Sequence, residues 1–364
     1  MTALPSRAPA PCAAATFANP ILDRGADPWV VFHDGRYVLC QAEGDAIVVR
    51  TAARLPDLGR EPGTVVWRPP PGRPYSCELW APECHLLGGR WFVYVAADDG
   101  RNEHHRMFVL EGTAPDPRQP FVLKGKLDLR PDRWAIDATV LALPDGRLYC
   151  LWSGWEGARN VAQNLYIAPM RDPWTVAGPR VLLSRPELAW ERRGSPWVNE
   201  GPQVLWNGDQ LFVVYSASGS WTDDYCLGLL RFRGGDVLDP RAWSKDPGPV
   251  FARTERVFGP GHASFTRAPD GAPWIVYHAA RAEGAGWDRR IHAQPFGWDD
   301  DGAPRFGPPL APGALLAWPT EAPGAPSRLR AARGRSLRAP TPRATVETPV
   351  RPLAGRAFSP GGTT

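Results

Sequence analysis

Three acidic residues and one histidine stand at matching places in a repeated sequence pattern. Asp27, Asp137, Glu200 and His262 each precede a turn glycine by eight or nine residues, and Ala81 holds the fifth such position. Packing alone favours residues such as Val, Leu or Ala inside strands, so the polar residues indicate a functional site. Two carboxyl groups can act as a general acid and a general base when their surroundings hold their pKa values apart.

Hydrolysis of a glycosidic bond needs this combination of groups. One carboxyl group protonates the leaving oxygen, and a second either attacks the sugar or activates a water molecule. A third carboxylate beside the proton donor would raise the donor's pKa by like-charge repulsion, which keeps the donor protonated near neutral pH. Asp27, Asp137 and Glu200 meet these requirements if the fold brings them together.

Five segments share the pattern around these residues: a polar or special residue, an apolar stretch, a turn at glycine and an aromatic-rich strand. The turn dipeptides DG, GG and NG between apolar runs are strong hairpin signals. A repeat that contains such a hairpin is typical of propeller blades, whose innermost strands line a central channel. The sequence therefore predicts an all-β fold, a five-bladed β-propeller in which the four polar residues converge. The turn glycines are Gly35, Gly89, Gly146, Gly208 and Gly271.

The composition changes along the chain and suggests three parts. We expect residues 1–15 to form a flexible N-terminus, residues 16–315 the catalytic propeller, and residues 316–364 a disordered tail rich in Pro and Arg. After Ala325 there are eight arginines and one acid, so the net charge of +4 hides about −3 on the remainder. That remainder has no nucleic-acid footprint, and the tail composition fits a solvated segment better than one that binds an acidic surface.

The N-terminus and the cysteines bear on the location of the protein in the cell. The first 20 residues hold one arginine and no long apolar run, which is a poor signal peptide. Cys40, Cys150 and Cys226 lie in apolar strand-like runs as buried thiols, and the six cysteines form no CxxC pair. We expect a cytoplasmic protein with a saccharide substrate and neither a nucleic-acid nor a membrane partner. The sequence leaves the oligomeric state open.

The segments around the acids resemble glycoside hydrolase family 43. They are ADPWV at Asp27, AIDATV at Asp137 and VNEGPQ at Glu200. Further stretches are similar to the α-L-arabinofuranosidase branch of that family: LWAPE, HRMFVLEG, LWSGWEG, QNLYIAPM, SASGSWTDDYCLG and GPGHASF. The resemblance covers roughly residues 16–315 and implies a five-bladed propeller that acts on carbohydrate.

The resemblance implies a role for each acid. Asp27 matches the general base that activates water, Asp137 the residue that orients the acid and tunes its pKa, and Glu200 the general acid. The family inverts the anomeric centre, so the carboxyl groups of Asp27 and Glu200 are expected to lie about 6.5–9.5 Å apart. No cofactor is required.

One metal site is implied by the same resemblance. His262 matches a channel histidine that often helps to hold a calcium or another ion through water. A single histidine without a second ligand at metal spacing is weak evidence. A hydrogen-bonded channel histidine without metal is an equal alternative.

Four further residues are predicted to bind substrate. Arg289 aligns with an arginine that reaches substrate hydroxyls, whereas Arg290 points to the opposite face of the same strand. Trp80 is expected to form a wall on which a sugar ring stacks. His105 and Trp155 lie in branch-specific stretches and are expected to line the pocket, although packing between blades explains them equally well.

The expected activity is that of an inverting, exo-acting α-L-arabinofuranosidase on α-1,5-linked arabinan or arabino-oligosaccharides. A β-xylosidase or an enzyme of mixed specificity is an alternative, because xylopyranose and arabinofuranose present similar hydroxyl patterns. A non-catalytic carbohydrate-binding propeller is a third reading, which the presence of all three acids disfavours.

Overall fold

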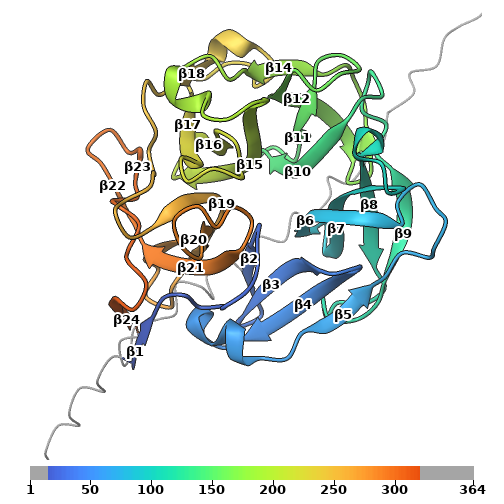
Figure 1. The fold of residues 1–364 in the computed structure, drawn as a ribbon. Helices are drawn as coiled ribbons and strands as arrows, with labels where there is room; N and C mark the ends of the chain where they lie inside the picture. The colour runs from blue at the N-terminus through green and yellow to red at the C-terminus, as the bar shows by residue number, and fades with distance from the viewer. Residues whose placement is uncertain (1–14, 320–364) are drawn as a thin grey trace, which may run out of the picture.

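The fold is a five-bladed β-propeller, as predicted. The computed structural model describes residues 15–319, and Figure 1 looks down on five groups of strands around a centre. The first two blades are β2–β5 (Trp29–His33, Arg36–Glu43, Ala46–Ala52, Thr64–Trp67) and β6–β9 (Cys77–Leu87, Arg90–Asp98, Arg106–Gly112, Phe121–Lys126). The third is β10–β14 (Ala135–Ala142, Leu148–Trp155, Ala162–Asp172, Thr175–Val176, Val181–Ser184). The last two are β15–β18 (Trp197–Asn207, Gln210–Ala217, Cys226–Phe232, Trp243–Lys245) and β19–β21 (Phe258–Arg267, Pro273–Ala280, Arg289–Pro295).

Short helical elements lie between strands. The described residues contain four 3-10 helices: η1 (Leu55–Arg60), η2 (Asn102–His104), η3 (Ala189–Glu191) and η4 (Pro240–Ala242). Three of these lie within a blade, and one, η3, lies between the third and fourth blades. A small hairpin of β22 (Gly297–Trp298) and β23 (Pro304–Arg305) lies outside the fifth blade.

The predicted turn glycines sit between the first and second strands of each blade. In the first blade His33 pairs with Arg36, and the intervening Asp34 and Gly35 both have positive φ. This is the backbone of a two-residue hairpin turn, which favours Asp-Gly because both positions need φ above zero. The hairpins fix the register in each blade and so carry the inner strands to a common end of the channel.

The core consists of five hydrophobic clusters, each between two neighbouring blades. Alternate residues of a strand serve different clusters: in β3, Leu39 packs toward the fifth blade, whereas Val38 and Cys40 pack toward the second. Because both faces of the strand are covered, its sequence is almost continuously apolar. Cys40, Cys150 and Cys226 are buried free thiols, as predicted.

The two ends of the described chain close the ring. Residues 21–25 run along β21 at the edge of the fifth blade and form one β-bridge, between Leu22 and Ile291; the Ile21 amide donates to the Ile291 carbonyl at 2.8 Å. Beside them, β1 (Ala15–Ala18) pairs with β24 (Leu315–Trp318).

The domain boundary expected at residue 315 therefore falls inside β24, where the Trp318 side chain packs into the core between the first and fifth blades. The rest of the predicted tail, and residues 1–14, lie outside the described residues.

Candidate active site

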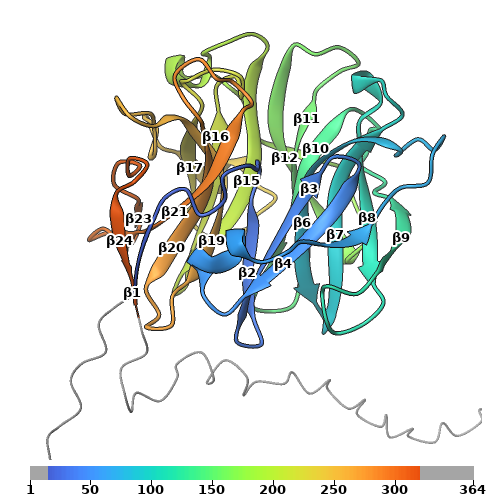
Figure 2. The ribbon, with the colours of Figure 1, turned by 60° about the horizontal axis from the view of Figure 1, so that its bottom comes forward.

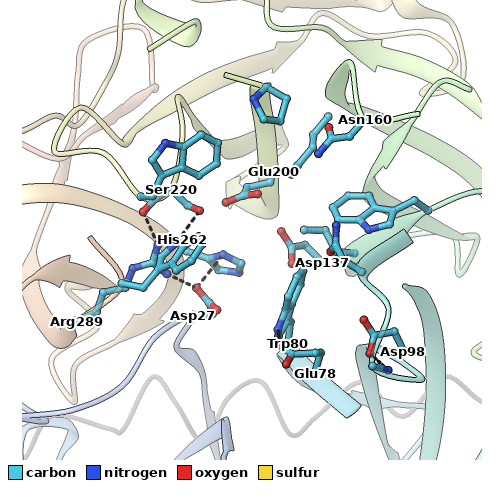
Figure 3. A pocket seen from close by; sticks show the side chains of 18 residues that line it. Asp27, Glu78, Trp80, Asp98, Asp137, Asn160, Glu200, Ser220, His262 and Arg289 are labelled. Carbon is cyan, nitrogen blue, oxygen red and sulfur yellow. Dashed lines mark hydrogen bonds and ion pairs between the residues drawn. The ribbon is translucent and has the colours of Figure 1, made fainter. Parts of the chain in front are cut away.

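A cavity of about 590 Å³ opens where the inner strands of the blades converge. Its lining includes the three predicted acids together with His262 and Arg289 (Figure 3). The acids come from three blades, and the histidine from β19 at the start of the fifth. The four polar residues that the sequence predicts to converge at one end of the channel lie together in this cavity.

A β-bulge recurs at this end of the inner strands β6, β10, β15 and β19 and re-aims the side chains there. In β10, Ile136 pairs with Ser153 and Thr139 with Leu151, so two residues stand opposite one. The first residue of the bulge, Asp137, has φ 57°. A bulge re-aims side chains, and a non-glycine residue in the left-handed region is uncommon, so its recurrence points to function. Ala81 and His262 occupy the same bulge position with φ 42° and 45°, and Asp27, just before β2, has φ 49°.

Glu200 does not occupy the first bulge position but lies one residue before it. In β15 the bulge begins at Gly201 with φ 51°, and Glu200 is the residue before it. The structural counterpart of Glu200 in the second blade is therefore Trp80, not Ala81. A Cβ on Gly201 would lie only 3.1 Å from His262 Nδ1, so close packing as well as backbone conformation favours glycine there.

Asp27 is surrounded by positive and polar groups. Its Oδ1 lies 3.2 Å from Nδ1 of both His262 and His278, and 3.5 Å from Nη1 of Arg289. Burial raises the pKa of Asp27, but these neighbours together outweigh it and hold the pKa below its usual value. Asp27 is therefore ionised at neutral pH, which is the state a base needs.

His278 is a buried neutral neighbour of this carboxylate. Burial lowers its pKa to about 3. Its Nδ1 also lies 3.2 Å from the Asp27 amide nitrogen, so it accepts from the amide or donates to the carboxylate according to the tautomer.

Glu200 lies in an environment of the opposite kind. Its Oε1 accepts a hydrogen bond from the Tyr225 hydroxyl at 2.8 Å. Burial raises the pKa of Glu200, and the charge of Asp27 acts in the same direction; His262, Tyr225 and Arg289 oppose the shift without cancelling it. Glu200 thus retains its proton to higher pH than an ordinary glutamate.

Asp137 shares this behaviour. Burial raises its pKa to about 8, and the charge of Glu200 adds to the effect. Its Oδ2 accepts the Gly201 amide hydrogen at 2.9 Å, which ties Asp137 to the residue next to Glu200. Burial thus shifts the pKa values of Asp137 and Glu200 in the same direction, upward.

His262 lies among the acids, and they raise its pKa. Burial lowers its pKa, but Asp27, Asp137 and Glu200 together raise it above the usual histidine value. No cluster of three or more His, Cys, Asp or Glu within residues 15–319 could hold a metal ion, and Nδ1 of His262 faces Asp27. The protein donors at this point do not make a calcium set. A water-mediated ion at His262 stays a prediction.

Arg289 and Arg290 take opposite faces of β21. Arg289 lines the cavity, and its Nη2 donates to the Ser220 carbonyl at 2.6 Å. Arg290 instead pairs with Asp23 at 3.2 Å on the outer side. Arg289 thus lines the cavity and helps to keep Asp27 ionised.

Trp80 forms part of the cavity wall and is supported from behind. Its ring stacks on His105 at a centroid distance of 3.9 Å, and its Nε1 donates to Glu78 Oε2 at 3.1 Å. His105 is fully buried; its Nδ1 lies 2.9 Å from Asp98 Oδ2 and its Nε2 lies 3.0 Å from the Glu78 carbonyl. His105 is absent from the cavity lining, so the structure places it as a support for Trp80.

Trp155 is likewise one layer behind the surface. It stacks on Trp134 at 4.8 Å with an interplanar angle of 9°, and Trp134 is the tryptophan that lines the cavity. Trp134 precedes β10 and was not singled out from the sequence.

Sequence reasoning missed several other groups of the site. Tyr225 and His278 stack on each other at 5.5 Å and connect the surroundings of Glu200 with those of Asp27. Two exposed tryptophans, Trp221 and Trp287, line the cavity from separate loops. Trp221 and Tyr225 belong to the SWTDDY segment, which is part of the family resemblance but indicates no role for either residue.

The sequence of this chain matches the model of a known protein family. A model of the Glycosyl hydrolases family 43 matches residues 17–304. The chain belongs to this family. It is accordingly a glycoside hydrolase, and the family resemblance predicted from its motifs is confirmed.

Within family 43, the chain is similar to several α-L-arabinofuranosidases. The chain is 36% identical to an α-L-arabinofuranosidase of Humicola insolens, covering 95% of this chain and 73% of that protein. It is 38% identical to an extracellular exo-α-(1→5)-L-arabinofuranosidase of Streptomyces chartreusis, covering 77% of this chain and 87% of the relative. The crystal structure of an α-L-arabinofuranosidase from Lactobacillus brevis superposes with a TM-score of 0.77 at 36% identity, covering 82% and 98% of the two chains.

The expected cytoplasmic location is not supported by these comparisons. The Streptomyces chartreusis relative and a second one from Streptomyces avermitilis are both named as extracellular enzymes. Across residues 15–319, no helix has the length and apolar character needed to cross a membrane.

Proposed function

We propose that this family 43 enzyme is an inverting, exo-acting α-L-arabinofuranosidase that removes terminal arabinose from α-1,5-linked arabino-oligosaccharides. The relatives named above support the sugar and the linkage. Its substrate is a saccharide, and the roles of the acids are those implied by the family motifs.

The observation that carries the proposal is the contrast between Asp27 and Glu200. Two carboxyl groups that line one cavity have pKa values shifted in opposite directions, one by cationic neighbours and the other by burial. Such a pair provides one base and one acid at the same pH.

In the proposed reaction Glu200 gives its proton to the glycosidic oxygen as the bond to the anomeric carbon breaks. A water molecule attacks that carbon from the opposite side, and Asp27 takes the proton that the water loses. Glu200 ends ionised and Asp27 protonated, so one proton must move back before the next turnover. Asp137, bound to the Gly201 amide, orients the segment that bears Glu200.

The test is proton NMR of the anomeric signals while the purified enzyme hydrolyses α-1,5-arabinotriose. We expect β-arabinofuranose to appear first, because inversion of an α-linkage yields the β-anomer. Glu200→Gln and Asp27→Asn should each reduce kcat by at least about 10³-fold, the upper part of the range attributed to a single acid or base.

A retained α-anomer would contradict inversion, and activity in either variant near the wild-type value would contradict that residue's role. Cleavage of xylobiose with no cleavage of arabinotriose would replace the substrate with that of a β-xylosidase. Inactivity toward both sugars would reject the proposed substrate.

A further inference from the structure

A second cavity of about 610 Å³ adjoins the candidate active site. The two cavities share two stretches of chain: Asn160 and Pro196 line the catalytic one, while their neighbours Arg159, Val161 and Trp197 line the second. A saccharide chain that leaves the catalytic cavity over these stretches would enter the second cavity directly.

This second cavity is rich in arginine. Arg159, Arg185 and Arg192 line it together with Glu156 and Glu187. Both acids already have cationic partners, since Glu156 lies 3.3 Å from Arg185 and Glu187 lies 3.5 Å from Lys245. Among the residues that the structure describes, Arg159 and Arg192 have no carboxylate partner. Two guanidinium groups are therefore available to an anion from outside.

An aromatic platform lies beside these charges. The guanidinium of Arg192 is held over one side of the Trp197 ring at 4.3 Å, and its Nε donates to the Pro186 carbonyl at 2.9 Å. Trp197 is 40% exposed, although it is a large apolar side chain. The stacked position and the carbonyl contact restrict the Arg192 side chain before any ligand binds, which lowers the entropy cost of binding.

The catalytic cavity is lined instead by five carboxyl groups, those of Asp27, Glu78, Asp98, Asp137 and Glu200, and by only two basic side chains, His262 and Arg289. A sugar that bears a carboxylate is therefore disfavoured in the catalytic cavity and favoured in the second cavity. The charges of the two cavities thus select between neutral and acidic sugars of one bound chain. Guanidinium forks match carboxylate geometry, and a flat indole suits the C–H face of a sugar ring.

We propose that the second cavity binds a uronate, that is, a sugar residue bearing a carboxylate, located further along the same saccharide whose terminal arabinose occupies the catalytic cavity. This inference rests on the proposed function for the identity of that terminal sugar. Arg159 and Arg192 bind the carboxylate, and Trp197 contacts the ring. The preferred substrates are then arabinose-bearing saccharides that also carry acidic sugars.

The experiment compares one acidic, arabinose-bearing polysaccharide before and after its carboxyl groups are reduced to alcohols with carbodiimide and borohydride. The ratio of kcat/KM for the native polymer to that for the reduced polymer should be about fivefold in the wild type, because exposed ion pairs are individually weak. It should fall to about one in the double variant Arg159→Gln/Arg192→Gln, and in the wild type at high salt, which screens exposed charges. Arg305→Gln is the matched control, because Arg305 is exposed on β23 and lines neither cavity.

Binding is measured separately by titration calorimetry with trigalacturonate and its methyl ester. Wild-type binding of the acid form, loss of that binding in the double variant, and no binding of the ester support the proposal whatever the enzyme hydrolyses. Equal rates on native and reduced polymer, or trigalacturonate binding that survives the double substitution, would overturn it. If arabinose release fails on both polymers while arginine-dependent binding persists, the proposed function fails and the uronate site stands.

Discussion

Replacing Tyr225 with Phe should move the alkaline limb of the activity profile upward. The Tyr225 hydroxyl donates to Glu200 Oε1 at 2.8 Å, and this bond lowers the pKa of Glu200 against the larger effect of burial. A hydrogen bond to a charged group contributes about 1.5–3 kcal/mol, and one pKa unit corresponds to about 1.4 kcal/mol. Without the hydroxyl the ionised form of Glu200 is less stable, so its pKa should rise by about 1–2 units.

The assay is kcat/KM as a function of pH, since this quantity reports the essential groups of the free enzyme. Phenylalanine keeps the aromatic ring, and with it the stacking on His278 and the position under the Arg289 guanidinium. The acid limb, which we assign to Asp27, should therefore stay in place. The alkaline limb alone should move.

Tyr277→Phe is the matched control, because it also removes a buried hydroxyl, one that donates to Gln294 Oε1 at 3.1 Å outside the cavity. The control should leave both limbs unchanged. An alkaline limb that stays fixed or moves downward in Tyr225→Phe would refute the assignment of Glu200 as the acid whose proton is lost there.

Three further outcomes follow from the site. Asp137→Asn should leave the alkaline limb of the kcat/KM profile unchanged below about pH 8, because Asp137 is itself protonated and uncharged there. A limb that moves to lower pH would instead show that the negative charge of Asp137 raises the pKa of Glu200. Arg289→Gln should move the acid limb to higher pH, because Arg289 helps to hold the pKa of Asp27 down, and an unmoved limb would contradict this. Gly201→Ala should lower the free energy of unfolding by about 1–2 kcal/mol, since φ is 51° and the new Cβ would lie 3.1 Å from His262; denaturant unfolding at unchanged stability would contradict the packing argument.

The sequence could predict the blades because each repeat carries its own local signals. The Asp-Gly and Gly-Gly turns set hairpins, and continuous apolar runs such as YVLC mark strands covered on both faces. Neither signal depends on distant residues. Closure of the ring does depend on them: the pairing of residues 21–25 with β21 joins segments more than 260 residues apart, and no local pattern announces it.

The position of Glu200 could be predicted only approximately. Counting back from the turn glycine treats each inner strand as regular, but a bulge places two residues opposite one and changes the count. The glycine of VNEGPQ is the available signal, because a left-handed backbone position favours glycine and the equivalent residues elsewhere are Asp137 and His262. Tyr225 and His278 had no such signal, since their contact with the acids exists only in the assembled blades.

The left-handed backbone position also explains how one repeat can supply two carboxyl groups with opposite pKa shifts. Asp27 takes the left-handed position itself, where the histidines and Arg289 reach its carboxylate. Glu200 comes from the position just before the bulge, where it meets the Tyr225 hydroxyl. Because the two positions project side chains from different points of the strand, equal blades give unequal surroundings, and the opposite pKa shifts of the two carboxyl groups are a consequence of that offset. A propeller with five identical bulge residues would place like groups in like surroundings, and it would lack the asymmetry that acid–base catalysis requires.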